Sequence, residues 1–197
     1  MIVNLIGGGP SAADLDTIRL KGLRIGINDA AFHKPCDVFF TNDHGYALGI
    51  REKIETFPGE RHLAVRQKFR ERFDGWQATI WRRVDEAEPS TRTGVLSSGP
   101  AGTPGCSGYV ALNLAAQFGG KTIILFGYDF DPIYRYFFNL APYPRVDIPG
   151  VIDSFRKVAP WYERRGIRIF NANPASAIDA FPRIPRDEAF CAGCSPM

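Results

Sequence analysis

The sequence predicts a single α/β domain of Rossmann-like type, with three layers and a mainly parallel sheet. Short apolar runs end in glycine or polar residues, and these runs alternate with segments of helical periodicity. The run from Thr122 to Phe126 is continuously apolar, which is typical of a central parallel strand covered on both faces. We expect the domain to span residues 1–186, followed by a C-terminal tail at 187–197.

The predicted strands are short. Ile2 to Ile6 ends in glycines, residues 23–27 end at Asn28-Asp29, and residues 37–40 end before "TNDH". Further strands are expected around 63–65, 78–81, 122–126 and 167–170.

Three helices are expected between these strands. The first begins at Ser11, which would cap it, and has Ala12, Leu15 and Ile18 on its apolar face. The second carries one apolar face from Val110 to Phe118 and stops at Gly119-Gly120. The third runs over residues 151–165.

The composition fits a globular protein kept in the cytoplasm. The 197 residues are 45% hydrophobic and 23% charged, with a net charge of +3. No apolar run approaches the roughly 20 residues of a membrane span, and the first residues lack the basic start of a secretory signal. We interpret Cys36 and Cys106 as reduced core residues. Cys191 and Cys194 form a CxxC without a nearby second ligand pair, and we expect no chemical role for it.

Positive residues gather between Arg61 and Arg83 and alternate with aromatic residues. They are Arg61, Arg66, Lys68, Arg70, Arg72, Arg82 and Arg83. Such a mixture can attract nucleic acid, but acidic residues dilute the charge here. We therefore interpret the segment as a solvated helix face and expect no nucleic-acid partner.

The predicted strand ends carry polar and glycine residues, which is where parallel sheets bind ligands. Gly7, Gly9 and Ala12 match the G-x-G-x-x-G/A dinucleotide fingerprint, with Asp29 about 20 residues further on. This pattern would indicate an NAD or FAD oxidoreductase. The helix after the turn carries Asp14 and Asp16, and no second nucleotide-binding half follows, so we rank this function below the alternatives.

Five segments, in order, resemble the bacterial sialyltransferases that use CMP-activated sialic acid. They are "GGGPSAADLD", "GINDA", "DVFFTND", "GCSGYVALNLAAQFGGKTIILFGYDF" and "IFNANPASAIDAFP". The same segments resemble the archaeal-type 6-hydroxymethylpterin diphosphokinases. The resemblance covers most of the chain except the basic segment and the cysteine tail.

The resemblance implies a nucleotide site and a set of catalytic residues. The residues implied to contact the nucleotide are Gly8, Gly9, Pro10, Ser11, Asn28, Asn42, Ser107 and Gly108. Backbone N–H groups and the helix start at Ser107 would offset phosphate charge. Asp129 would lie at the carboxyl edge of the sheet, and Tyr134 or Tyr136 would steady the leaving phosphate.

Two departures from the sialyltransferase pattern concern the chemistry. That family places a histidine base well downstream of its D-F segment, whereas His33, His44 and His62 all lie upstream here. Asp131 also stands where the family has a tyrosine. We take His44 as the candidate base, with a packing role as the alternative.

Three functions stay open after these considerations. We favour a nucleotide-dependent glycosyltransferase that takes a CMP-type sugar donor, needs no cofactor and acts on a small molecule or glycan. The first alternative is an ATP-dependent pyrophosphokinase, in which Asp43 and Asp131, with Asp129, would hold Mg²⁺. The second is a non-catalytic nucleotide-binding protein. The sequence leaves a homo-oligomer open.

Overall fold

The computed structural model describes residues 1–84, 95–97, 106–131, 135–139 and 147–191. The strands are β1 (Ile2–Ile6), β2 (Leu23–Ile27), β3 (Val38–Thr41), β4 (Glu60–Arg66), β5 (Thr79–Val84), β6 (Val95–Ser97), β7 (Thr122–Phe126) and β8 (Arg168–Asn171). The α-helices are α1 (Ala30–His33), α2 (His44–Gly49), α3 (Arg51–Glu55), α4 (Ser107–Gln117), α5 (Ile148–Glu163) and α6 (Arg186–Cys191). Three 3-10 segments complete the elements: η1 (Pro10–Ala12), η2 (Thr17–Arg19) and η3 (Gln67–Phe73).

The strands form one sheet, and every pair of neighbours in it is parallel, which confirms the predicted α/β class. Their order is β6-β5-β4-β3-β2-β1-β7-β8. At its centre β1 pairs with β2 on one side and with β7 on the other, so Leu5 lies between Ile25 and Leu125. Chain order therefore reverses across β1, because β7 returns to the free side of the first strand.

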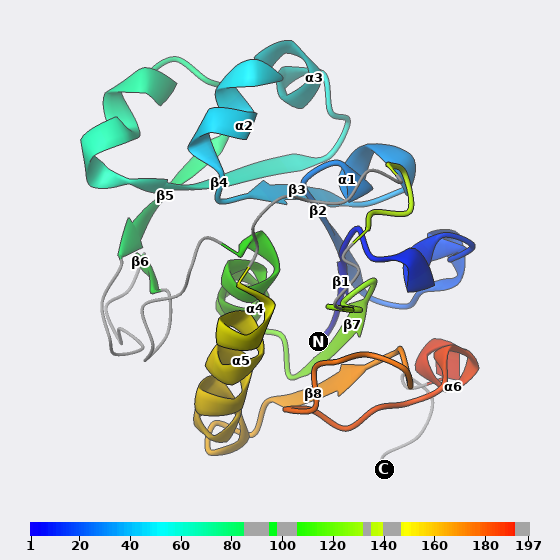
Figure 1. The fold of residues 1–197 in the computed structure, drawn as a ribbon. Helices are drawn as coiled ribbons and strands as arrows, with labels where there is room; N and C mark the ends of the chain where they lie inside the picture. The colour runs from blue at the N-terminus through cyan, green and yellow to red at the C-terminus, as the bar shows by residue number, and fades with distance from the viewer. Residues whose placement is uncertain (85–94, 98–105, 132–134, 140–146, 192–197) are drawn as a thin grey trace.

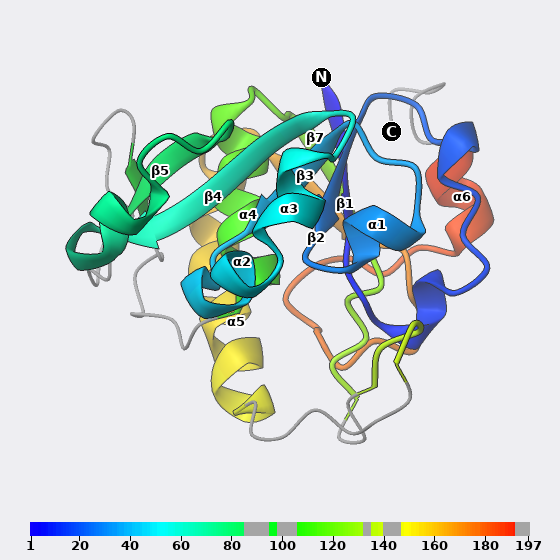
Figure 2. The same ribbon diagram turned by 90° about the horizontal axis from the view of Figure 1, so that it is seen from above.

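Helices cover both faces of this sheet. Helices α4 and α5 lie side by side on one face, and α1, α2 and α3 lie on the other (Figure 1). Figure 2 shows the same layers from above. Successive side chains of a strand point to opposite faces, so Phe40 packs in the cluster with α4 and α5 while Phe39 packs with Ala31 and Ile54. The strands are apolar in sequence because their side chains are buried on both faces of the sheet.

The first predicted helix is wrong. Residues 10–19 contain only the two short 3-10 segments η1 and η2, separated by a turn, with Ala12 and Leu15 buried but Ile18 73% exposed. The Ser11 hydroxyl donates to the Asp129 carboxylate at 2.8 Å and caps no helix. The Asp16 side chain accepts from the Ile18 N–H and begins the second short turn.

The remaining predicted elements are present with shifted ends. Helix α4 begins at Ser107 and β7 has the predicted bounds, while the weakly marked strands near 63 and 79 become β4 and β5. Of the basic segment, only η3 is helical, so its predicted helix face is restricted to residues 67–73. Helix α6 begins at the predicted domain end, and its Ala189 is buried. Cys194 lies outside the described residues. Within the part of the chain described here, no helix is long and apolar enough to cross a membrane.

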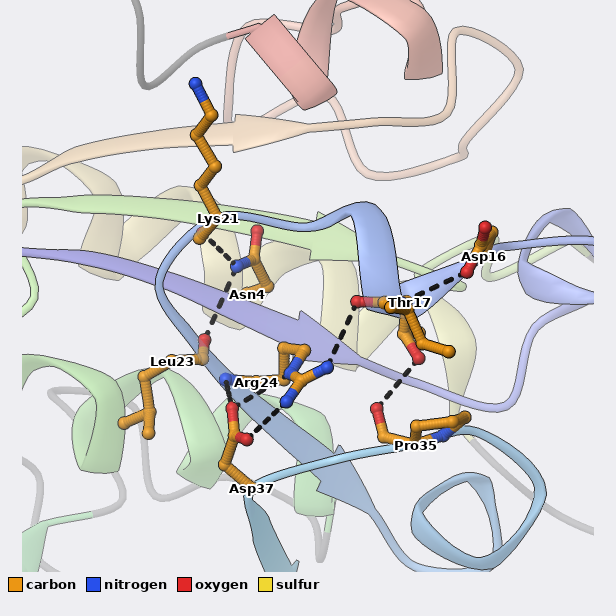
Figure 3. Close-up of polar contacts among 9 residues, drawn as sticks. Asn4, Asp16, Thr17, Lys21, Leu23, Arg24, Pro35 and Asp37 are labelled. Atoms are coloured by element: carbon orange, nitrogen blue, oxygen red, sulfur yellow. Dashed lines mark hydrogen bonds and ion pairs between the residues drawn. The ribbon is translucent and has the colours of Figure 1, made fainter.

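A polar network fixes the start of β2 (Figure 3). Arg24 binds Asp37 through two side-chain nitrogens, at 2.9 and 2.5 Å, and its backbone N–H donates to the same carboxylate at 2.9 Å. Arg24 also donates to the Thr17 carbonyl, and Thr17 donates to the Pro35 carbonyl. Asn4 in β1 donates to the Lys21 carbonyl at 2.8 Å. The network ties η2 and the loop before β3 to the central strands.

The Arg24–Asp37 pair gives a pH-dependent contribution to stability. The hydrogen bonds from Arg24 hold the pKa of Asp37 below its usual range. The contribution is therefore complete above the unfolded-state pKa of about 3.9 and is lost as pH falls through the lower folded-state pKa. We expect Asp37→Asn to lower the free energy of unfolding by about 1 kcal/mol at pH 7, with a smaller difference at pH 3, as measured by urea denaturation.

Asp179→Asn is the matched control, since Asp179 makes a similar two-nitrogen pair with Arg156 on an exposed surface. It should cost less stability than Asp37→Asn. Equal losses in the two variants, or a difference for Asp37→Asn that does not change with pH, would contradict the anchoring role.

Candidate functional site

The carboxyl ends of β1 and β7 meet where the strand order reverses, the usual ligand position in an open parallel sheet. The backbone N–H of Gly7 donates to the Phe126 carbonyl at 2.8 Å, and that of Gly9 donates to the Gly127 carbonyl at 2.9 Å. The glycine turn after β1 is thus bound to the segment after β7. These two N–H groups are already satisfied by the protein.

Close approach explains why this turn is made of glycine. A Cβ at Gly7 would lie 2.8 Å from the Gly127 carbonyl oxygen, and a Cβ at Gly9 would collide with the Asp129 carboxylate. At Gly8 a Cβ would meet the ring of Tyr136, whose neighbour Phe137 donates its N–H to the Gly8 carbonyl at 2.8 Å. Packing therefore accounts for all three glycines without a phosphate.

Asp129 holds the turn in place. Its carboxylate accepts from the Ser11 hydroxyl at 2.8 Å, from the Ser11 N–H at 3.2 Å and from the Asn173 amide at 2.8 Å. Burial raises the pKa of Asp129, and the bonds from Ser11 partly oppose that rise. The carboxylate joins β1, β7 and the segment after β8 at one point. Ser11 and Gly9 as nucleotide contacts stay predictions.

The ends of β3 and α4 also meet, as the resemblance implies for a shared site. The Ser107 hydroxyl at the first residue of α4 donates to the Asn42 side-chain oxygen at 2.5 Å, and both residues are buried. Tyr128 donates to the Gly108 carbonyl at 3.0 Å, and a Cβ at Gly108 would make a tight contact of 3.0 Å with its ring. The Asn42 amide nitrogen has no hydrogen-bond partner among the described residues.

Two more buried polar atoms near Asn42 lack a hydrogen-bond partner in the described part of the chain. They are the Asn28 side-chain oxygen and the Tyr46 hydroxyl. Asn28 follows β2, has φ of 52°, and donates its N–H to the Phe40 carbonyl of β3 at 2.9 Å. Tyr46 is the third residue of α2, four residues after Asn42. Buried polar groups without partners cost free energy, so such a group is a candidate for binding a ligand.

Sequence reasoning missed Tyr46. Burial raises the pKa of its phenol, and the charge of the nearby Asp29 carboxylate and a side-chain contact with it raise the pKa further. Asp29, which the dinucleotide fingerprint assigned to a ribose, also lies 3.6 Å from the Lys53 ammonium. No motif marks Tyr46, because its position depends on where the short helix α2 begins.

The remaining predicted residues have other contacts. His44 begins α2 and its ring stacks on Phe69, with centroids 4.0 Å apart. Asp43 is exposed and caps α2 by accepting from the Tyr46 N–H at 3.0 Å. Asp131 is exposed, and within the described ranges no three His, Cys, Asp or Glu residues are grouped to hold a metal. Tyr134 lies outside the described residues, whereas Tyr136 stacks on Phe138 at 5.0 Å.

No protein-family model and no curated protein matches the chain. Its structure is similar to the sialyltransferase CstII from Campylobacter jejuni in complex with the substrate analogue CMP-3FNeuAc, with TM-score 0.56, 16% identity, and coverage of 92% of this chain and 85% of that one. CST-II in complex with a trisaccharide acceptor and CMP gives TM-score 0.57, 16% identity, and coverage of 93% and 86%. For MAf glycosyltransferase from Magnetospirillum magneticum AMB-1, the TM-score is 0.61 and the sequence identity is 17%. The match covers 94% of this chain and 34% of that one.

These likenesses establish a shared fold. The chain has the α/β fold of glycosyltransferases, and nearly all of it takes part in the match. It spans about a third of the MAf protein. The resemblance to pterin diphosphokinases gains no support from these structures.

The contacts of Asp129 predict that its shape matters more than its charge for stability. Asp129→Ala leaves the Ser11 and Asn173 donors without an acceptor and should lower the free energy of unfolding by about 1–3 kcal/mol. Asp129→Asn keeps one oxygen for these donors, and its amide can donate to the Ser11 hydroxyl. It also removes a buried charge, so its stability should lie within about 1 kcal/mol of the parent protein at pH 7. Denaturant titration of both variants measures the difference, and equal losses would contradict this role.

Proposed function

We propose that the protein is a glycosyltransferase that binds a cytidine nucleotide-sugar at the carboxyl ends of β2 and β3. The observation that carries the proposal is a set of three buried polar atoms, on Asn28, Asn42 and Tyr46, that have no hydrogen-bond partner among the residues the structure describes. The group contains one acceptor, one donor and one hydroxyl that can act as either. CMP carries hydrogen-bond donors and acceptors on its ribose hydroxyls, its phosphate and the edge of its cytosine ring, and these are the groups that such atoms bind.

Further support comes from the fold and from the start of α4. The similar structures include complexes whose ligands are CMP and CMP-3FNeuAc. The positive end of an eleven-residue helix suits a phosphate near Ser107 and Gly108. We assign Gly8, Gly9, Pro10 and Ser11 the task of shaping this phosphate pocket from the opposite side.

The proposed reaction exchanges one C–O bond for another. The bond between the anomeric carbon and the phosphate oxygen breaks, and CMP leaves with that oxygen. An acceptor hydroxyl forms the new bond and gives up its proton to a base. We assign the base to His44, two residues after Asn42, and the steadying of the leaving phosphate to Tyr134. The reaction proposed here requires no cofactor, so chelation of metal ions should leave its rate unchanged.

Tyr46→Phe tests the binding site with a matched control, Tyr109→Phe. Both tyrosine hydroxyls are buried and without a hydrogen-bond partner among the described residues, but Tyr109 packs against Phe155 between α4 and α5. Neither substitution should lower the melting temperature, since each removes an unsatisfied group. Isothermal titration with CMP should show about tenfold weaker binding for Tyr46→Phe and unchanged binding for Tyr109→Phe.

The same titration separates the alternatives. Binding of Mg²⁺-ATP without binding of CMP would contradict the glycosyltransferase proposal and favour a pyrophosphokinase. Binding of NAD or FAD alone would favour an oxidoreductase. CMP binding with no turnover of any CMP-sugar would favour a nucleotide-binding protein without catalysis.

His44→Phe tests the base, because phenylalanine can keep the stack on Phe69 but cannot take a proton. We expect kcat for release of CMP from CMP-sialic acid, in the presence of a saccharide acceptor that the parent protein uses, to fall by about 10²-fold or more, with CMP affinity unchanged. His33→Phe is the control, since His33 also stacks on a phenylalanine, Phe138, at 4.9 Å. A His44→Phe variant with the kcat of the parent protein would remove His44 from the chemistry.

A further inference from the structure

Segment η3 presents three basic side chains that have no carboxylate partner in the described part of the chain. Lys68, Arg70 and Arg72 are exposed and together form what we call the basic rim. The acidic residues of the same stretch, Glu71 and Asp74, make no ion pair with them. As far as the described residues go, the basic rim is therefore exposed and has no acidic side chain paired with it.

Several other basic residues of the protein are paired locally. Arg24, Arg51 and Arg156 pair with Asp37, Glu55 and Asp179 at 2.5–2.9 Å. Arg61, which belongs to the same basic segment of the sequence, donates to the carbonyls of Phe57 and Gln77 instead. The lack of such partners sets the basic rim apart from these residues.

The basic rim lies on the same edge of the sheet as the proposed nucleotide site. Segment η3 follows the carboxyl end of β4, which pairs with β3, and Asn42 follows the carboxyl end of β3. The contact between Phe69 of η3 and His44 of α2, with ring centroids 4.0 Å apart, joins the two regions directly. The rim is thus a neighbour of the proposed base.

The Phe69 ring also holds two cations close to this contact. The Lys68 ammonium lies 5.0 Å from the ring centroid and the Arg72 guanidinium 5.5 Å from it. Cations at such distances are attracted by the ring quadrupole, so the contact restrains flexible side chains beside the stack. Two positive charges are thus held around the aromatic ring on which His44 stacks.

We propose that the basic rim binds an anionic group of the acceptor, and that the acceptor is a negatively charged saccharide. The inference rests on the proposed glycosyltransferase function and adds its acceptor class. Three unpaired cations at an exposed site favour carboxylate or phosphate, and their attraction weakens as salt screens it. A neutral saccharide has no anionic group that could pair with these three side chains.

The test compares matched charged and neutral saccharides on the full chain in the presence of CMP. The probes are tetragalacturonate with its neutral methyl ester, and maltotetraose phosphate with maltotetraose. The parent protein should bind a charged member at least tenfold more tightly than its neutral partner at 50 mM salt, with the preference reduced at 500 mM. A preference for the carboxylated or the phosphorylated pair identifies which anion the rim accepts.

The variant with Lys68→Gln, Arg70→Gln and Arg72→Gln should lose about tenfold in affinity for the charged saccharide. The control with Lys157→Gln, Arg164→Gln and Arg165→Gln removes the same charge near the far end of α5, which leads into the amino end of β8. It should keep the preference. Both variants should bind CMP with the same affinity, which separates the acceptor site from the donor site.

Two outcomes would overturn the inference. Equal affinity for charged and neutral saccharides would contradict it while leaving the proposed function intact if CMP still binds. Binding of phosphatidylglycerol vesicles through the rim, with no saccharide preference, would assign the surface to a membrane instead. Failure of CMP to bind the parent protein would contradict the proposed function, whereas a charge preference retained there would still support the rim as an anion site.

Discussion

The contact between the glycine turn after β1 and the Gly127–Asp129 segment after β7 governs the geometry of the candidate site. β7 follows β1 by more than one hundred residues in the chain, yet it pairs with β1 along five consecutive positions. Two backbone hydrogen bonds extend that pairing beyond the strands, and Asp129 completes it through Ser11. Any side chain at Gly7 or Gly9 would separate the two segments. The carboxyl edge can then present other residues to a ligand.

This arrangement changes the meaning of the G-x-G pattern. In a dinucleotide fold the glycines let a pyrophosphate approach the backbone. Here the N–H groups of Gly7 and Gly9 serve the connection to β7, and a carboxylate lies where a Cβ would otherwise project. Three of the buried polar atoms that lack a partner within the described residues lie instead after β2 and β3. The ligand site we propose is therefore centred beside the glycine turn, toward α2 and the start of α4, with the basic rim on its far side.

Much of the fold could be predicted from the sequence, because buried strands and helices are recognisable from the apolar residues within each segment. Ile123 to Phe126 is apolar at every position since both faces are covered, and α4 is rich in apolar residues, of which Val110 to Leu112 are all buried. The failures involve partners that are distant in the chain. Ser11 has the sequence features of a helix cap, but Asp129, 118 residues away, takes its hydroxyl. Asn42 and Ser107 were both named from the resemblance, yet their direct bond, 65 residues apart, has no local signal. Tyr46 and the stack of His44 on Phe69 depend on the start of a six-residue helix that no periodicity marks.

The central claim is that a cytidine nucleotide binds at the carboxyl ends of β2 and β3. A crystal structure of the protein soaked with CMP tests it most directly. The account predicts CMP within hydrogen-bond distance of the Asn42 amide and the Asn28 side-chain oxygen, with its phosphate near the start of α4. CMP bound elsewhere, or an empty edge at saturating CMP with the two asparagines unchanged, would contradict it.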